Sequence, residues 1–328
     1  MPLIRTVLPA RLMHLAGLAV SAVIALPLLT TDASAQLVSC ESIQKDWLAM
    51  PLSAGHEDRV RIYDQAFNDS DCDGMVVEGF GKEIIDARLD VIAPFQDLEG
   101  YTGNLETLKQ DLTDLQEFGS HWRISYLLGE ILRKQQQTLP AFRAYQEALG
   151  LVDDTELTPA EPAHAMIARL RDRLDELAVV VAQISEEPRD IKIPVTRSGQ
   201  SISQYSFSTR GYKRKKTLVP IQFVYDQDVM TKAGRTSFED VQEALEKQGS
   251  PDIQVVGHTD PVGSDAYNMQ LSMKRAEAVR SALLAAGYSG SIEVLGMGES
   301  QPFQFDDPSL YTEDVRNQAH RRVEFVRK

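Results

Sequence analysis

Short apolar segments alternate with longer helical segments over residues 218–328 of this 328-residue chain. Four segments are apolar and rich in β-branched or aromatic residues, as is typical of strands: 218–225, 253–256, 292–295 and 322–326. Two segments between them carry apolar residues at helical spacing: 235–248 and 264–286. Strands separated by helices of this length predict an α/β sandwich, a mixed sheet with helices packed on it.

The longer of these predicted helices has a charged residue on the face that should pack against the sheet. Arg275 interrupts an apolar row at i, i+4 spacing, between Leu271 and Val279. A guanidinium that faces a packed sheet is costly unless an acceptor meets it. Asp260 follows the strand predicted before this helix, at the sheet edge where open α/β sheets commonly bind ligands. We therefore expect Asp260 and Arg275 to face each other at the top of the sheet.

A set of motifs in one register surrounds this pair. It comprises Gly257-His258-Thr259-Asp260, Gly263-Ser264, Tyr267-Asn268, Leu271-Ser272, Arg275-Ala276, Gly296-x-Gly298-Glu299, Pro302 and Arg321-Arg322-Val323-Glu324. Together they resemble the signature of the OmpA-like domain, which is shared by OmpA C-terminal halves, peptidoglycan-associated lipoproteins and flagellar stator proteins. The resemblance covers residues 218–328 and predicts a peptidoglycan-binding domain there.

The resemblance also implies a ligand and a role for each site residue. The family's ligand is the diaminopimelate of the peptidoglycan stem peptide, so Asp260 would receive its ammonium and Arg275 would clamp a carboxylate. A planar guanidinium matches a carboxylate in a bidentate manner, which suits that role. Asn268 would add side-chain hydrogen bonds, Thr259 a flanking contact, and Arg321 a second basic wall.

Two features around this site need interpretation. The residue before Arg321 is His320 where the family usually has Asn or Asp, so the geometry of the basic wall is expected to differ. His258 is interpreted as a packed turn residue and not as a metal ligand or base, because no His-x-x-x-His spacing or nucleophile accompanies it. We expect the protein to bind a ligand without catalysis, and we expect no catalytic residue, metal or cofactor. The alternative for Asp260 and Arg275 is a purely structural ion pair.

Residues 1–35 have the pattern of a secretory signal peptide. Arg5 and Arg11 give a basic start, residues 15–29 are mostly apolar, and Ala33-Ser34-Ala35 is a small-x-small cleavage site before Gln36. A membrane anchor is the alternative, but the apolar core is short for a span of about 20 residues. The pattern predicts export, and the OmpA-like resemblance then implies a periplasmic protein associated with the cell wall or outer membrane.

Cys40 and Cys72 are the only two cysteines. In an oxidising compartment such a pair is expected to form a disulfide, which would add about 3 kcal/mol by constraining the unfolded chain. The alternative is lipidation, because Leu37-Val38-Ser39-Cys40 resembles a lipobox.

Residues 36–184 are predicted to form an all-α domain, followed by a linker at 185–217 with one short strand at 191–195. The clearest helical pattern covers 104–183, with breaks near 119–120, 138–140 and 153–162. Within 122–155 the spacing resembles one tetratricopeptide repeat, a pair of antiparallel helices, through Leu128-Gly129, Ala141, Tyr145 and Ala148. A degenerate repeat array and an ordinary helix hairpin remain alternatives.

Charge separates the two halves of the chain. Residues 36–190 contain 14 Lys and Arg against 30 Asp and Glu, whereas residues 191–328 contain 18 against 17. An acidic chain without a basic groove argues against nucleic-acid binding. We expect a wall-binding protein whose helical domain contacts a basic envelope protein; an adaptor with secondary wall binding, or less favourably a wall-modifying enzyme, is the alternative.

Overall fold

The computed structural model describes residues 39–51, 55–94, 98, 100–184, 205–224 and 226–328. Ser39–Lys328 form one compact unit. The predicted signal peptide and the predicted short strand at 191–195 lie outside the described residues. Within the described ranges, no helix is long and apolar enough to span a membrane.

The described part begins with three helices, α1 (Cys40–Ala49), α2 (His56–Asn68) and α3 (Gly74–Ile92). The predicted Cys40–Cys72 disulfide is confirmed: it joins α1 to the turn before α3, with 5.0 Å between the Cα atoms. A lipid on Cys40 would need the same sulfur atom, so this structure excludes it. Helix α3 begins at Gly74, where the Asp73 side chain caps it by accepting the N–H of Met75.

Five further helical elements form the second part of the helical region. They are α4 (Leu105–Leu115), the 3₁₀ helix η1 (Gln116–Phe118), α5 (Trp122–Lys134), α6 (Thr138–Asp153) and α7 (His164–Ile184). The predicted all-α region is therefore confirmed. The break predicted at 138–140 lies at 135–137 instead, because Pro140 sits in the first turn of α6, where its missing N–H costs no helical bond.

Helices α5 and α6 form the hairpin expected within residues 122–155. At Gly129 a Cβ atom would lie 2.7 Å from Tyr145 Cε1, so the ring of Tyr145 can pack on α5 only because Gly129 has no side chain. Ala141 and Ala148 are fully buried beside it. The relation of this hairpin to tetratricopeptide repeats stays a prediction.

Residues 205–217, which precede the predicted domain boundary at 218, belong to the described structure. The strands β1 (Ser208–Thr209) and β2 (Tyr212–Lys213) form a short antiparallel hairpin. Tyr205 and Phe207 are buried in the core of the C-terminal domain. The last thirteen residues of the predicted linker, 205–217, are thus part of the folded domain, since these two aromatic side chains supply enough apolar surface to pack.

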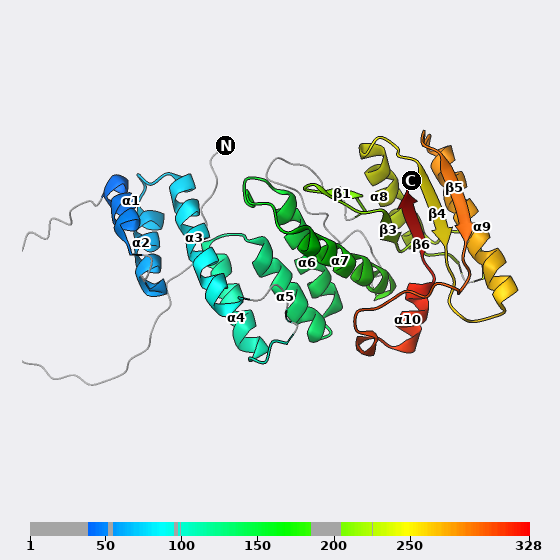
Figure 1. Cartoon of the computed structure of the whole chain (residues 1–328), viewed down its shortest axis with the longest axis horizontal. Coiled ribbons are helices and arrows are strands. Elements are labelled where there is room, and N and C mark those ends of the chain that lie inside the picture. Colours follow the sequence, from blue (N-terminus) through cyan, green and yellow to red (C-terminus); the bar gives the residue numbers. More distant parts are fainter. Residues whose placement is uncertain (1–38, 52–54, 95–97, 99, 185–204, 225) are drawn as a thin grey trace, which may run out of the picture. The chain divides into compact units, whose positions relative to one another are not determined.

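The C-terminal domain is built on a four-stranded mixed sheet, in which β6 (Val323–Arg327) lies between β3 (Lys216–Val219) and β4 (Ile253–Gly257) (Figure 1). The edge strand β5 (Ile292–Gly296) runs parallel to β4, whereas β6 is antiparallel to both its neighbours. This confirms the predicted mixed sheet.

Helices α8 (Lys232–Lys247) and α9 (Asp265–Ala285) share one core with the sheet. On the other face, Leu218 contacts a small apolar cluster with Val179 of α7 and Ala319 of α10 (Glu313–His320). Because successive residues of a strand point to opposite faces, Val219 belongs to the main core and Leu218 to this cluster. The helical region therefore packs on the second face of the sheet.

The predicted strand 218–225 is wrong in its second half. Strand β3 ends at Val219, directly before Pro220, which has no N–H to donate to a sheet. The residues that follow form a loop held by a single bridge between Phe223 and Met230. This loop becomes part of the candidate site.

Candidate functional site

The loop between β4 and α9 forms the centre of the site. Glycine is required at Gly257, where a Cβ atom would collide with the carbonyl oxygen of Ser272, so the strand can approach α9 closely. Helix α9 begins after Ser264, whose side chain accepts the N–H of Tyr267. This cap places Thr259 and Asp260 in the turn directly above the first residues of α9.

Asp260 is 8% exposed and already has two partners. Its Oδ1 accepts the backbone N–H of Val262 at 2.9 Å. Its Oδ2 lies 2.5 Å from Nη1 of Arg321, which is the residue after α10. The side chain of Arg321 is 36% exposed. The backbone N–H of Val262 thus holds one carboxylate oxygen of Asp260, and the partly exposed guanidinium of Arg321 pairs with the other.

Arg275 is 5% exposed and has no carboxylate partner within ion-pair distance among the described residues. Its Nε donates to the carbonyl oxygen of Gln227 at 3.1 Å, and its guanidinium carbon lies 5.2 Å from the ring centre of Phe223. Burial lowers the pKa of Arg275 to about 10, and the positive charge of Arg321 adds to this, while the carboxylates of Asp260, Asp226 and Asp228 oppose it. A buried positive charge therefore remains without a neutralising contact.

The pairing within the site differs from the sequence prediction. Asp260 and Arg275 lie near enough to influence each other's charge, but the ion pair of Asp260 is with Arg321. Arg275 satisfies its Nε through a backbone carbonyl and an aromatic face instead. The structure therefore brings two guanidinium groups to one carboxylate, which gives this three-residue group a net positive charge.

Asn268 and Thr259 are also in the site, but both are buried. The Asn268 Nδ2 donates to the carbonyl oxygen of Asp260 at 3.3 Å and to Glu299 Oε2 at 2.5 Å. The backbone N–H of Thr259 donates to Gly298 at 2.9 Å, and its hydroxyl is buried without a partner in the described part of the chain. These contacts tie the Asp260 loop to the turn after β5.

A second group of charged side chains, centred on Glu324, lies next to the loop that carries Asp260. Glu324 of β6 lies 2.8 Å from Arg322, 3.2 Å from Lys216 and 3.6 Å from the ring of His258. Burial alone would raise the pKa of Glu324, but its contacts with His258 and Arg322 outweigh burial and lower this pKa to about 2. His258 is buried, as predicted, and in the described ranges no three His, Cys, Asp or Glu side chains are grouped to hold a metal.

The comparison with protein families decides the identity of this domain. Residues 222–315 match the family model described as the OmpA family. These residues form an OmpA-family domain. The name is kept below for the whole C-terminal domain that contains them, residues 205–328. The matched range includes Thr259, Asp260, Asn268 and Arg275, whereas Arg321 lies beyond it.

The relatives of this domain include outer membrane proteins of known sequence. Outer membrane porin F of Pseudomonas fluorescens is 32% identical over 83 residues, which are 25% of this chain and 26% of that protein. Outer membrane protein A of Klebsiella pneumoniae is 55% identical over 49 residues, 15% of this chain and 14% of that protein. The chain thus spans about a quarter or less of the length of these relatives.

A solved structure with a similar chain is the peptidoglycan-associated lipoprotein from Burkholderia pseudomallei. It is 25% identical, with a TM-score of 0.28 over 35% of this chain and 91% of that one.

Sequence reasoning missed the loop that holds Arg275 in the OmpA-family domain. Phe223 and Gln227 supply the ring and the carbonyl oxygen, and Asp226 accepts the hydroxyl of Tyr267. The signal was present, since Pro220 ends a strand and Asp226-Gln227-Asp228 has the composition of a turn. His320 also has a role, because its Nδ1 accepts the N–H of Phe303 at 3.0 Å and so anchors the segment before α10.

Proposed function

We propose that this protein is a non-catalytic cell-envelope protein whose OmpA-family domain binds peptidoglycan. The observation that carries the proposal is the buried guanidinium of Arg275, which has no carboxylate partner in the described chain and lies beside Asp260. A site of this kind suits a ligand that brings its own carboxylate and ammonium group. The diaminopimelate of the stem peptide has both groups.

In the proposed complex a ligand carboxylate binds Arg275 and the ligand ammonium binds Asp260. The carboxylate neutralises a guanidinium that is already desolvated, so little further water has to be removed from it. The ammonium has to share or replace the contact of Asp260 with Arg321, whose side chain is partly exposed and can turn toward a second ligand carboxylate. Arg321 then acts as the basic wall that the family resemblance implied.

Asn268 and Thr259 have supporting roles in this proposal. The Asn268 amide holds the carbonyl oxygen of Asp260, so it positions the carboxylate and reaches the ligand only at its edge. The unpartnered hydroxyl of Thr259 is available for a hydrogen bond once the loop adjusts to a ligand. Both side chains preserve the turn on which the binding groups stand.

We further propose that the chain is exported and acts in the periplasm, at the cell wall or outer membrane, with its helical region presented to an envelope protein. The support is the signal-peptide pattern in residues 1–35, the disulfide between Cys40 and Cys72, and the repeat-like hairpin of α5 and α6. Disulfides persist in oxidising compartments, which agrees with export.

Co-sedimentation with purified peptidoglycan sacculi tests the wall-binding proposal. Arg275→Ala and Asp260→Ala should each weaken binding by about 2–5 kcal/mol, because each change leaves a desolvated charge of the complex without its partner. Free diaminopimelate should compete with sacculi for the wild-type protein.

Arg280→Ala is the matched control, since Arg280 lies on the same helix, is exposed and pairs only with Glu277 within the described chain. It should pellet like the wild type. Circular dichroism and thermal unfolding check that all variants are folded. Folded Arg275 and Asp260 variants that pellet normally would show that the ligand does not bind at this site.

A further inference from the structure

A polar cleft of about 1480 Å³ lies between the helical region and the OmpA-family domain. Its walls are parts of α5 and α7, the segment 212–216 and the segment 302–310. Nine basic and seven acidic side chains line it. This balance contrasts with the acidic helical region as a whole, so basic residues are concentrated at the cleft.

The floor of the cleft is a buried carboxylate, Glu130, which is 2% exposed. It accepts hydrogen bonds from Arg173 Nε at 2.8 Å and from the hydroxyl of Tyr145 at 2.7 Å. Nη2 of Arg133 lies 3.4 Å from it. These contacts fix both guanidinium groups toward the cleft.

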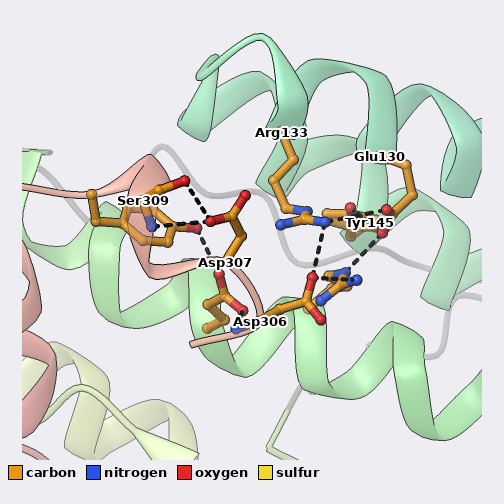
Figure 2. Close-up of polar contacts among 9 residues, drawn as sticks. Glu130, Arg133, Tyr145, Asp306, Asp307 and Ser309 are labelled. Atoms are coloured by element: carbon orange, nitrogen blue, oxygen red, sulfur yellow. Dashed lines mark hydrogen bonds and ion pairs between the residues drawn. The ribbon is translucent and has the colours of Figure 1, made fainter. Parts of the chain in front are cut away.

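The chain places one of its own carboxylates on these two arginines. Figure 2 shows Asp306 directed toward Arg133, close to the pair of Glu130 and Tyr145. Asp306 Oδ2 lies 3.2 Å from Arg133 and 3.0 Å from Arg173, and its side chain remains 48% exposed. The neighbouring sequence is Phe303-Gln304-Phe305-Asp306-Asp307, in which aromatic residues precede two acids.

This internal contact leaves the arginine site incomplete. Arg133 is 6% exposed, and its Nε and Nη1 are buried with no hydrogen-bond partner in the described structure. Only one oxygen of Asp306 is used, although a carboxylate can satisfy a guanidinium fork with both. Around the cleft, Lys134, Lys213 and Lys215 are exposed and form no ion pair with any described residue. The cleft thus has unused capacity for negative charge.

We propose that the cleft is the docking site for an acidic segment of a protein partner, with a partner carboxylate replacing Asp306 on Arg133 and Arg173. The three lysines contact further acidic side chains of that segment. Phe303 and Phe305 precede Asp306 in this chain, so we expect the partner segment also to place an apolar side chain next to its carboxylate. The inference deepens the proposed protein-interaction role of the helical region and uses none of the residues proposed to bind the wall. It also changes the expected partner, because overall charge predicted a basic one and the cleft favours an acidic one.

Fluorescence anisotropy on the full chain tests this proposal. The probe is a labelled peptide that copies residues 302–311, and a second peptide carries Asn in place of both aspartates. The acidic peptide should bind, and Asp306→Asn should strengthen binding about tenfold or more, because it removes the internal competitor from the site. Lys213→Glu combined with Lys215→Glu should weaken binding about tenfold or more, because it places like charges together. Both lysines are exposed, so this variant should fold normally.

Several outcomes would overturn the proposal. They are equal binding of the two peptides, no gain in the Asp306→Asn chain, or insensitivity to the lysine changes. Self-association of the Asp306→Asn chain without peptide binding would assign the cleft to a second copy, and binding of soluble muropeptides there would assign it to the wall. The cleft variants should still pellet with sacculi, because Asp260 and Arg275 are intact in them, so failure here is distinguishable from failure of the wall-binding proposal.

Discussion

The helical region and the OmpA-family domain bury arginine in opposite ways. In the helical region Arg173 lies between two carboxylates of the chain itself, Glu130 and Asp306. In the OmpA-family domain Arg275 is equally inaccessible, yet its contacts are a backbone carbonyl and an aromatic ring. Burial of a charge therefore says little about its role until its partners are known, since Arg173 contacts two carboxylates and Arg275 contacts none that the structure describes.

Replacing each arginine in turn should show the largest difference in stability between the two regions. Arg173→Ala should lower the free energy of unfolding by about 3–5 kcal/mol, because Glu130 stays buried after losing its closest cation. Arg275→Ala should cost only about 1 kcal/mol, because no described carboxylate loses an ion pair. Urea unfolding at pH 7, followed by circular dichroism, measures both. Equal losses would mean that Arg275 is also a structural residue.

The disulfide gives the next largest effect and should be confined to the helical region. Cys72→Ser should cost about 3–4 kcal/mol by the loop-entropy estimate for a sequence separation of 32 residues. Hydrogen exchange read by mass spectrometry should show faster exchange in α1 to α3 and unchanged exchange in the four-stranded sheet. Faster exchange throughout the sheet would show that the two regions unfold as one unit.

Acid should act on the OmpA-family domain through Glu324, with a smaller effect. The pKa of this carboxyl is about 2 in the folded protein and near 4.5 ordinarily, so its stabilisation is full above pH 4.5 and disappears as the pH falls toward 2. The shift corresponds to about 3 kcal/mol. Urea unfolding between pH 2 and 6 should show this loss in the wild type and a flatter profile in Glu324→Gln.

Glu243→Gln is a suitable control for that titration. Glu243 is an exposed residue on α8 of the same domain, where it pairs with Lys247. Its variant should keep the wild-type pH profile. A flat wild-type profile below pH 4.5 would contradict the role given to Glu324.

Much of the fold was predictable because local patterns determine it. The helix at 264–286 has a serine cap and a glycine stop at positions that the structure uses within one residue. The errors occur where tertiary contacts override local composition. Tyr205 and Phe207 lie in a polar stretch that resembles a linker, yet the core of the next domain recruits them.

The residues of the candidate site could be named from the sequence, but their pairing could not. Arg321 reaches Asp260 only because α10 ends beside the β4 loop, and the two residues are 61 positions apart. The contact between Arg133 and Asp306 spans 173 positions and involves no sequence motif. Periodicity reports which residues are buried on one element, and it contains no information on which distant element supplies the partner.

The segment between β5 and β6 connects both candidate sites through one short piece of chain. Asp306 within this segment contacts the cleft arginines, and Arg321 near its end contacts Asp260. A ligand that draws one end away changes the free energy needed to release the other, and this linkage has the same size in both directions. Binding of the wall would then change the affinity for the protein partner, and binding of the partner would change the affinity for the wall by the same factor.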